Sequence, residues 1–213
     1  MSDLQKRREQ EKQQRHFDIL DAAEKVFAEK GYDRTSMDDI ARTANLSRAL
    51  LYVYFKDKAA IQHGIMLRAG DALRSRFADA MATAGTGLEI IRAMGRSYYH
   101  FWEEEPDYFD ALTKAATVME HAAPEQAEQM SCCENETMNL MIQAIRTGLE
   151  DGSMNAERIS DPLQTALYLR GALHGVVMMC QQEMGEAGPL AHYPRESLIN
   201  YSMEMLTQSI KAT

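Results

Sequence analysis

Residues 35–58 read TSMDDIARTANLSRALLYVYFKDK, and this stretch indicates two short helices joined by a tight turn. Thr35 and Ser36 can cap the first of these helices, and two aspartates follow in its first turn, where the helix dipole favours acids. Asn45 tolerates the left-handed conformation in which helices often end, and Ser47 can cap the helix that follows. Two helices of about eight residues with such a turn between them form a helix-turn-helix arrangement.

Upstream of this stretch, the sequence predicts a first helix that starts at residue 17 and stops at Gly31. Its apolar residues recur at three- and four-residue spacing, as in Ile19, Leu20, Ala23, Val26 and Phe27. Residues 1–16 are polar and charged and offer no apolar face, so we expect a frayed helix or a flexible basic arm there. The expected DNA-binding unit is therefore residues 17–58.

Many residues of this unit stand in a recognisable register: Ala22-Ala23, Phe27, Gly31-Tyr32, Thr35-Ser36-Met37, Asp39-Ile40-Ala41, Ala44, Leu46-Ser47, Leu51-Tyr52 and Tyr54-Phe55. The run closely resembles the DNA-binding domain of the TetR/AcrR family of transcription regulators. The chain departs from that pattern at Asn45, where the family usually has Gly, and at Ala49, where it often has Gly or Pro. Leu50 stands where the family more often has a small or hydroxylated residue. The resemblance implies a homodimeric repressor that a ligand removes from DNA.

The helix after Ser47 is expected to lie in the major groove, with its first residues at the base edges. We expect Arg48 to read a base, and Ala49 and Leu50 to pack on thymine methyls or sugars. The resemblance implies phosphate or sugar contacts by other residues, although a lone tyrosine is more often a core-edge aromatic and a lone lysine a solvated charge. The full expected DNA-contacting set is Thr35, Ser36, Ser47, Arg48, Ala49, Leu50, Tyr52, Tyr54 and Lys58.

Charge is distributed unevenly along the 213 residues. The net charge of −9 argues at first against nucleic acid, because DNA binding neutralises phosphates with Lys and Arg. Residues 1–58, however, carry 12 Lys and Arg against 11 Asp and Glu, whereas residues 59–213 carry 11 against 21. The acidity therefore belongs to the second part, as a two-module DNA-binding protein can show.

Residues 59–213 read as helical throughout, with no strand signal. We expect helices over 61–81, 88–104, 107–121, 124–149, 163–184 and 195–210, which gives an all-α chain of about nine helices. This part is the expected effector-binding and dimerisation domain. No segment has the roughly 20 apolar residues of a membrane span and no signal peptide is recognisable, so we expect a cytoplasmic protein without a membrane partner.

The last two predicted helices are the expected dimer interface. One helix-turn-helix reads only a few base pairs, and a two-fold dimer places two copies about 34 Å apart on a palindrome of double-stranded operator DNA. Residues 163–184 carry more apolar surface than one neighbour can cover, although this could also be the buried helix of a monomer. The expected interface residues are Gly171, Gly175, Met178, Met179, Ile199, Met203, Leu206 and Ile210.

Aromatic and methionine residues gather in the middle of the chain, which has 15 Met in all. Because Met is flexible and polarisable, these residues suit an adaptable apolar pocket, although ordinary core is an equally good interpretation. The effector could be a drug-like aromatic, a fatty acyl chain or another hydrophobic metabolite. The expected pocket residues are Tyr98, Phe101, Trp102, Phe109, Met119, Met138, Met141, Ile142 and Leu173.

Two other function classes stay open. Cys132-Cys133 with His121, Glu134 and Glu136 could form a thiol or metal sensor, but their spacing matches no zinc pattern, and Cys180 is expected to be a third reduced thiol. A helical enzyme or carrier for an apolar small molecule, using residues 88–190, is the other alternative. No nucleophile motif, phosphate loop or dinucleotide fingerprint occurs, so we expect no catalysis, no cofactor and no metal.

Overall fold

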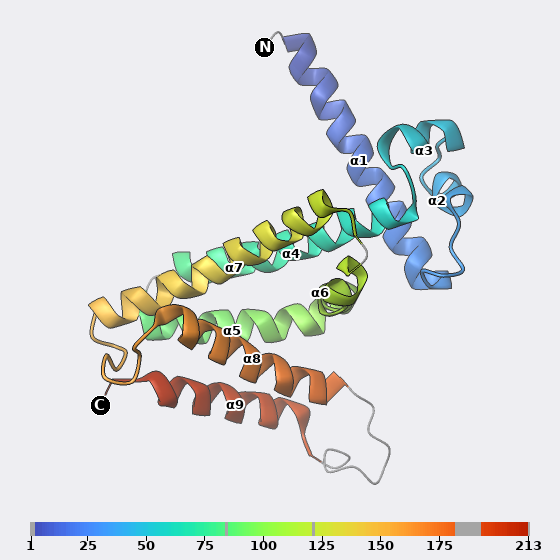
Figure 1. Ribbon diagram of the computed structural model, residues 1–213. Helices are drawn as coiled ribbons and strands as arrows, with labels where there is room; N and C mark the ends of the chain where they lie inside the picture. The colour runs from blue at the N-terminus through green and yellow to red at the C-terminus, as the bar shows by residue number, and fades with distance from the viewer. Residues whose placement is uncertain (1–2, 84, 121, 182–192, 213) are drawn as a thin grey trace.

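The computed structural model describes residues 3–83, 85–120, 122–181 and 193–212, and over these ranges the protein is all-helical (Figure 1). Its only β feature there is an isolated bridge between Met154 and Lys211. The all-α prediction is therefore confirmed. The helices are α1 (Asp3–Lys30), α2 (Met37–Thr43), α3 (Arg48–Tyr54), α4 (Lys58–Ala82), α5 (Gly87–Glu104), α6 (Pro106–Met119), α7 (Pro124–Glu150), α8 (Pro162–Gln181) and α9 (Arg195–Ile210).

The N-terminal unit consists of α1, α2, α3 and the start of α4, which surround a small apolar core. Ile19, Ile40, Leu51 and Ile61 contribute one fully buried side chain from each of these four helices. Asn45 has a φ of 54°, so it takes the left-handed conformation expected where α2 gives way to the turn. The helix-turn-helix therefore has its own core, which fixes α3 against α1 and α2.

The first helix is longer than the sequence indicated. Residues 3–16, expected as a frayed helix or flexible arm, form the first half of one continuous α1, and Figure 1 shows this half projecting away from the rest of the molecule. Local pairs stabilise it without a buried face, because Arg7 lies 3.0 Å from Glu11 and Gln14 donates to Asp18 over 2.9 Å, each four residues apart. The arm is thus helical and exposed.

Helices α4 to α9 form the larger unit. Helices α4, α5 and α7 pack against one another, and α8 and α9 lie side by side along α5 and α7 (Figure 1). Two buried clusters share this unit, one around Met94 and Ile145 and one around Phe101 and Phe109. The predicted end of the eighth helix, at 184, and most of the predicted 185–194 loop lie outside the described residues. Among the described residues, no helix is both long and apolar enough to cross a membrane.

Helix α4 connects the two units. Its first turns belong to the N-terminal core through Ile61, while its later residues, such as Phe77, are buried in the larger unit. Arg68 adds a polar connection, since its guanidinium donates to Asp21 and Glu24 of α1 over 2.5 and 3.0 Å. Helix α4 is thus in direct contact with α1 as well as with the larger unit.

Candidate DNA interface and ligand cavity

Helix α3 presents one buried and one exposed side. The hydroxyl of Ser47 accepts a hydrogen bond from the backbone N–H of Leu50 over 3.2 Å and so caps the helix, and Leu51 is fully buried beneath it. On the other side Leu50, Tyr52 and Val53 are 38%, 42% and 76% exposed. Several solvent-exposed apolar side chains on so short a helix are typical of an interaction surface.

Arg48 lies on this exposed side at the start of α3. Its Nη1 is 3.3 Å from Asp38 Oδ2, and its guanidinium carbon is 5.6 Å from the centre of the Tyr52 ring. Both charged groups are exposed, and an exposed ion pair contributes little free energy, so another acceptor can replace Asp38. The position suits the base-reading role expected for Arg48, and that role stays a prediction.

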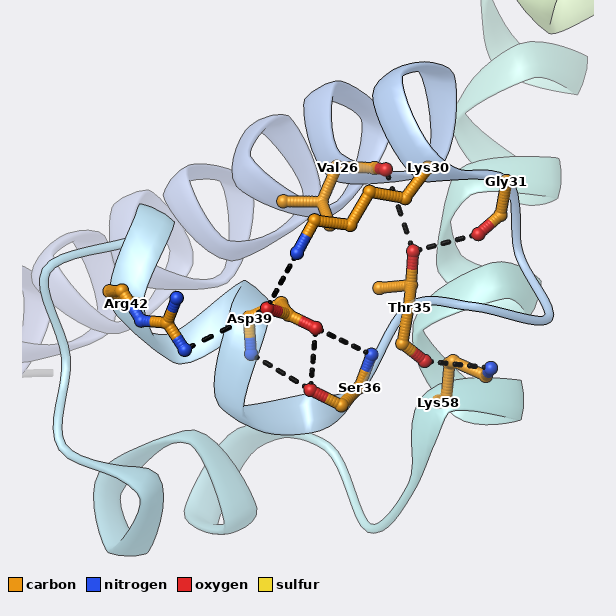
Figure 2. A network of polar contacts seen from close by, with 8 residues as sticks. All are labelled: Val26, Lys30, Gly31, Thr35, Ser36, Asp39, Arg42 and Lys58. Carbon is orange, nitrogen blue, oxygen red and sulfur yellow. Dashed lines mark hydrogen bonds and ion pairs between the residues drawn. The ribbon is translucent and has the colours of Figure 1, made fainter.

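The start of α2 is a closed capping network (Figure 2). Asp39 N–H donates to the Ser36 hydroxyl over 3.2 Å, while Ser36 N–H donates to Asp39 Oδ2 over 3.1 Å. Lys30 donates to the same carboxylate over 2.7 Å, and this bond, with those from Ser36, holds the pKa of Asp39 well below its usual range. The Ser36 hydroxyl is exposed but already serves the cap.

Thr35 and Lys58 anchor the loop between α1 and α2, which differs from the DNA contacts expected for them. Thr35 is buried, and its hydroxyl donates to the carbonyl of Gly31 over 2.8 Å. Lys58 Nζ donates to the carbonyl of Thr35 over 2.8 Å (Figure 2). It also donates to the carbonyl of Tyr32 over 2.5 Å and lies 4.3 Å from the centre of the Tyr32 ring. Loop carbonyls satisfy this ammonium group in the free chain, so both residues have a structural role there, and the DNA contacts expected for them stay predictions.

The expected DNA-contacting set lacks Val53, which is exposed on α3, and includes Tyr54, which is only partly exposed. Val53 stands three residues after Leu50, so it shares the exposed face of α3, a signal that the helical period could have given. Tyr54 is half-buried against the N-terminal core. Both residues also line a shallow groove between α3 and α1, opposite Lys12 and His16. The expected Ala49 is exposed on the same helix.

A cavity of about 480 Å³ lies among the helices of the larger unit, with walls from α4 to α9. A volume of this size is within the range of small-molecule sites. Six of the residues expected to bind ligand line it: Tyr98, Phe101, Phe109, Met138, Met141 and Leu173. Trp102 and Ile142 do not line it, because Trp102 packs against Tyr99 and Ile142 packs against the core around Ile145. The side chain of Met119 lies outside what the structure describes.

The cavity wall also holds polar residues that sequence reasoning missed. Tyr98 OH lies 2.6 Å from His174 Nδ1, and burial raises the pKa of Tyr98 and lowers that of His174. Arg170 and Glu134 line the wall as an ion pair of 2.6 Å, and Arg92 lines it while bonded to Glu204 outside it. Arg170 and His174 interrupt the apolar run of α8 four residues apart, and this interruption was the available signal.

The surface of α8 is apolar and open where the glycines lie. Gly171 and Gly175 are exposed, and a methyl group added at either would touch nothing within 4 Å. Met179 is 47% exposed in line with them, and Met178 is half-buried. Half of the large hydrophobic side chains exposed among the described residues lie on this helix and α9: Leu163, Leu167, Tyr168, Met179, Tyr201 and Met205.

Four residues of α9 do not face outward as expected. Ile199 and Ile210 are buried in the chain's own core, and Met203 and Leu206 line the cavity. Their spacing identified the inner side of an amphipathic helix, and a single sequence cannot distinguish burial against the same chain from burial against a partner.

The cysteines do not form a built site among the described residues. Cys132 is exposed, whereas Cys133 is half-buried against α4, and burial raises the pKa of the Cys133 thiol. No cluster of three His, Cys, Asp or Glu residues suited to a metal occurs in the described part of the chain, and His121 lies outside it. Cys180 is buried, where burial also raises its pKa.

Known proteins resemble part of this chain in sequence. Residues 19–63 fit the family of bacterial regulatory proteins, tetR family. The transcriptional activator FasR of Mycolicibacterium smegmatis is 30% identical over 92 residues, 43% of this chain and 42% of FasR. The negative regulator of the biofilm operon icaADBC, IcaR of Staphylococcus aureus, is 49% identical over 43 residues, 20% of this chain and 23% of IcaR. The matched segments thus span less than half the length of either relative.

The likeness of fold extends further than the likeness of sequence. The crystal structure of the TetR family regulator PfmR from Thermus thermophilus superposes with a TM-score of 0.65 and 23% identity, covering 89% of this chain and 97% of PfmR. The helix-turn-helix thus matches in sequence and the remaining helices match in fold. Residues 19–63 of this chain therefore match the tetR family of bacterial regulatory proteins, and the chain as a whole shares the fold of a TetR family regulator.

Proposed function

We propose that this protein is a transcriptional regulator that binds a palindromic operator as a homodimer and leaves it when a small hydrophobic effector fills the cavity. The observation that carries the proposal is the exposed side of α3, where Arg48 stands beside the exposed side chains of Leu50, Tyr52 and Val53. Groups of these kinds hydrogen-bond guanine and pack on thymine methyls in the major groove. The positive balance of residues 1–58 supports phosphate contacts around them.

The surface of α8 supports the proposal of a homodimer. Leu163, Leu167, Gly171, Gly175 and Met179 recur every four residues and form one exposed stripe along that helix. Glycines within an apolar stripe allow a second helix to approach closely, and α9 adds exposed Tyr201 and Met205 next to it. An isologous contact of this face would place two α3 helices on one side of the dimer for two half-sites.

The effector would act by population shift. A dimer that holds its two α3 helices at operator spacing binds DNA, and a ligand that prefers another spacing lowers the fraction of that state. Helix α4 is the proposed lever, because Gly70, Leu73 and Phe77 line the cavity while its first turns lie in the DNA-binding core. We expect repression, the role printed for IcaR, since IcaR has the higher identity over its matched segment, 49% against 30% for the activator FasR.

The test is binding of the full chain to the DNA upstream of its own gene, followed by fluorescence anisotropy. We expect sequence-selective binding that weakens steeply with salt, and a change of Arg48 to Ala that reduces discrimination at one operator position by about 1–3 kcal/mol. The matched control is Arg146→Ala, an arginine of α7 in the larger unit, which should leave base preference unchanged.

Two results would contradict the proposal. One is a chain that turns over or carries an apolar compound but ignores duplex DNA at low ionic strength, which would favour an enzyme or carrier. The other is an Arg48→Ala variant with wild-type affinity and base preference, which would show that α3 does not read the operator through this residue.

A further inference from the structure

The cavity contains one polar pair set among aromatic rings. Tyr98 of α5 and His174 of α8 are joined by the 2.6 Å contact between the phenol oxygen and Nδ1, and the ring of Phe109 lies 5.7 Å from Tyr98 and 6.0 Å from His174, centre to centre. A polar group that is removed from water costs free energy unless it is hydrogen-bonded, and here each member of the pair has the other as its partner.

This pair has an unused donor whichever tautomer is present. If the phenol donates to Nδ1, the neutral imidazole carries its proton on Nε2; if Nδ1–H donates to the phenol oxygen, the phenol O–H is free. Burial, followed by the positive charge of Arg170, lowers the pKa of His174, so the neutral ring predominates at pH 7. In both cases one N–H or O–H remains for an acceptor, because the described residues supply no other partner to either side chain.

The charged side chains of the cavity wall, by contrast, are already in ion pairs. Arg170 is paired with Glu134 at 2.6 Å, and both line the cavity. Arg92 is paired with Glu204 at 2.5 Å. A carboxylate or phosphate on the ligand would meet cations whose charge is already balanced by an acid, within a part of the chain that has a net charge of −10. An anionic ligand therefore finds no free cation here.

We infer that the effector is an uncharged, largely apolar molecule with one oxygen acceptor, such as a ketone, ester or lactone carbonyl, which hydrogen-bonds to the Tyr98–His174 pair. This inference rests on the proposed regulator function and specifies the chemical class of ligand that the cavity binds. The aromatic and aliphatic walls hold the apolar body, and the pair fixes its orientation and excludes hydrocarbons without an acceptor.

The test uses three near-isosteric probes with the same ring attachment: acetylnaphthalene, isopropylnaphthalene and naphthoate. Their dissociation constants for the full chain are measured by equilibrium dialysis. We expect acetylnaphthalene to bind about tenfold more tightly than either of the others, the factor that one hydrogen bond can supply. Equal affinities for the ketone and the hydrocarbon, tighter binding of naphthoate, or no binding of any probe would overturn the inference.

Variants assign the effect to the pair. In His174→Phe the preference for the ketone should fall to within about twofold, and in Tyr98→Phe it should fall by about threefold, because the imidazole loses the partner that fixes its tautomer. Tyr99→Phe is the matched control, since the Tyr99 hydroxyl donates to exposed Glu103 and does not line the cavity. If His174→Phe does not fold, an unchanged preference in Tyr98→Phe is the contradicting result.

Operator binding is measured in the same preparations without probe. A chain that binds DNA but shows no ketone preference contradicts the ligand class alone. A chain that shows the preference and ignores DNA contradicts the regulator function and leaves the chemistry of the cavity standing.

Discussion

Lys58 holds together a loop of the N-terminal unit in the free chain. Its ammonium group donates to the carbonyls of Tyr32 and Thr35, and these hold the loop that leads into the capped start of α2. Hydrogen bonds from a charged donor are worth about 1.5–3 kcal/mol, so Lys58→Met should lower the free energy of unfolding by about that much. Urea denaturation followed by circular dichroism measures the change.

Lys56→Met is the control for this prediction. Lys56 is exposed two residues earlier, so its loss should change stability by less than about 0.5 kcal/mol. Lys58→Met could instead leave stability unchanged and reduce the slope of operator affinity against salt concentration by about one. That result would support the phosphate contact implied by the family resemblance.

His63 links stability to pH. It is buried, with Nε2 3.1 Å from the carbonyl oxygen of Gln126, and burial lowers its pKa despite that hydrogen bond. The unfolded chain therefore binds a proton that the native chain resists, so stability should be complete above the unfolded pKa of about 6.5 and should fall as the pH drops below it. Denaturation at pH 7.5 and pH 5.5 should show a smaller difference for His63→Gln than for the wild type. An equal difference in both proteins would show that His63 titrates normally.

At the scale of elements, Arg68 joins three helices. From α4 it donates to Asp21 and Glu24 of α1, and Tyr108 of α6 donates to the same Glu24 over 3.2 Å. Arg68 is also only 18% exposed, which makes its contacts stronger than those of a surface pair. Arg68→Gln should therefore reduce the effect of ligand on operator affinity at least threefold, while ligand affinity itself stays within twofold.

The matched control is Arg76→Gln. Arg76 also stands on α4 and pairs with Glu104 and Glu105, but it does not contact α1. Operator anisotropy with and without ligand gives the coupling for each variant. If both variants reduced it equally, general loosening of α4 would explain the result, and the connection through Arg68 would have no special role.

The elements themselves could largely be predicted from sequence, because caps and apolar periods are local. Ser36, Asn45 and Ser47 mark the ends of α2 and α3, and the structure confirms each conformation. The first half of α1 could not be predicted in this way, since its helix is supported by i,i+4 polar pairs and not by an apolar face. Pairs of polar side chains produce no apolar repeat in the sequence, so the periodicity of apolar residues cannot reveal this part of the helix.

The sites could be predicted only in part, because they depend on which side of each helix meets which neighbour. Tyr98 and Phe109 were expected in the pocket and line it, whereas His174 and Arg170 come from a helix that, apart from Leu173, was assigned to the dimer interface. Thr35 has the residue type of a phosphate contact, yet its hydroxyl is buried. These differences concern orientation, which needs the packing of distant segments.

For the whole molecule, the proposed dimer depends on the exposed stripe of α8. Gly171 lies at its centre, and a Cβ atom added there meets nothing within 4 Å in the single chain, so Gly171→Arg should fold normally and even gain helix propensity. In a symmetric dimer two such arginines would face each other in an apolar contact without a partner charge. We expect the dimer dissociation constant, measured by sedimentation equilibrium, to rise at least about 30-fold, or roughly 2 kcal/mol.

Operator binding should weaken with the dimer, because a monomer can occupy only one half-site and loses the advantage of linking two. Gln129→Arg, an equal change of charge at an exposed position of α7, should affect neither quantity. A Gly171→Arg protein that remained as strongly dimeric as the wild type would exclude α8 as the interface. The geometry that sets the spacing of the two α3 helices would then have to come from another face of the larger unit.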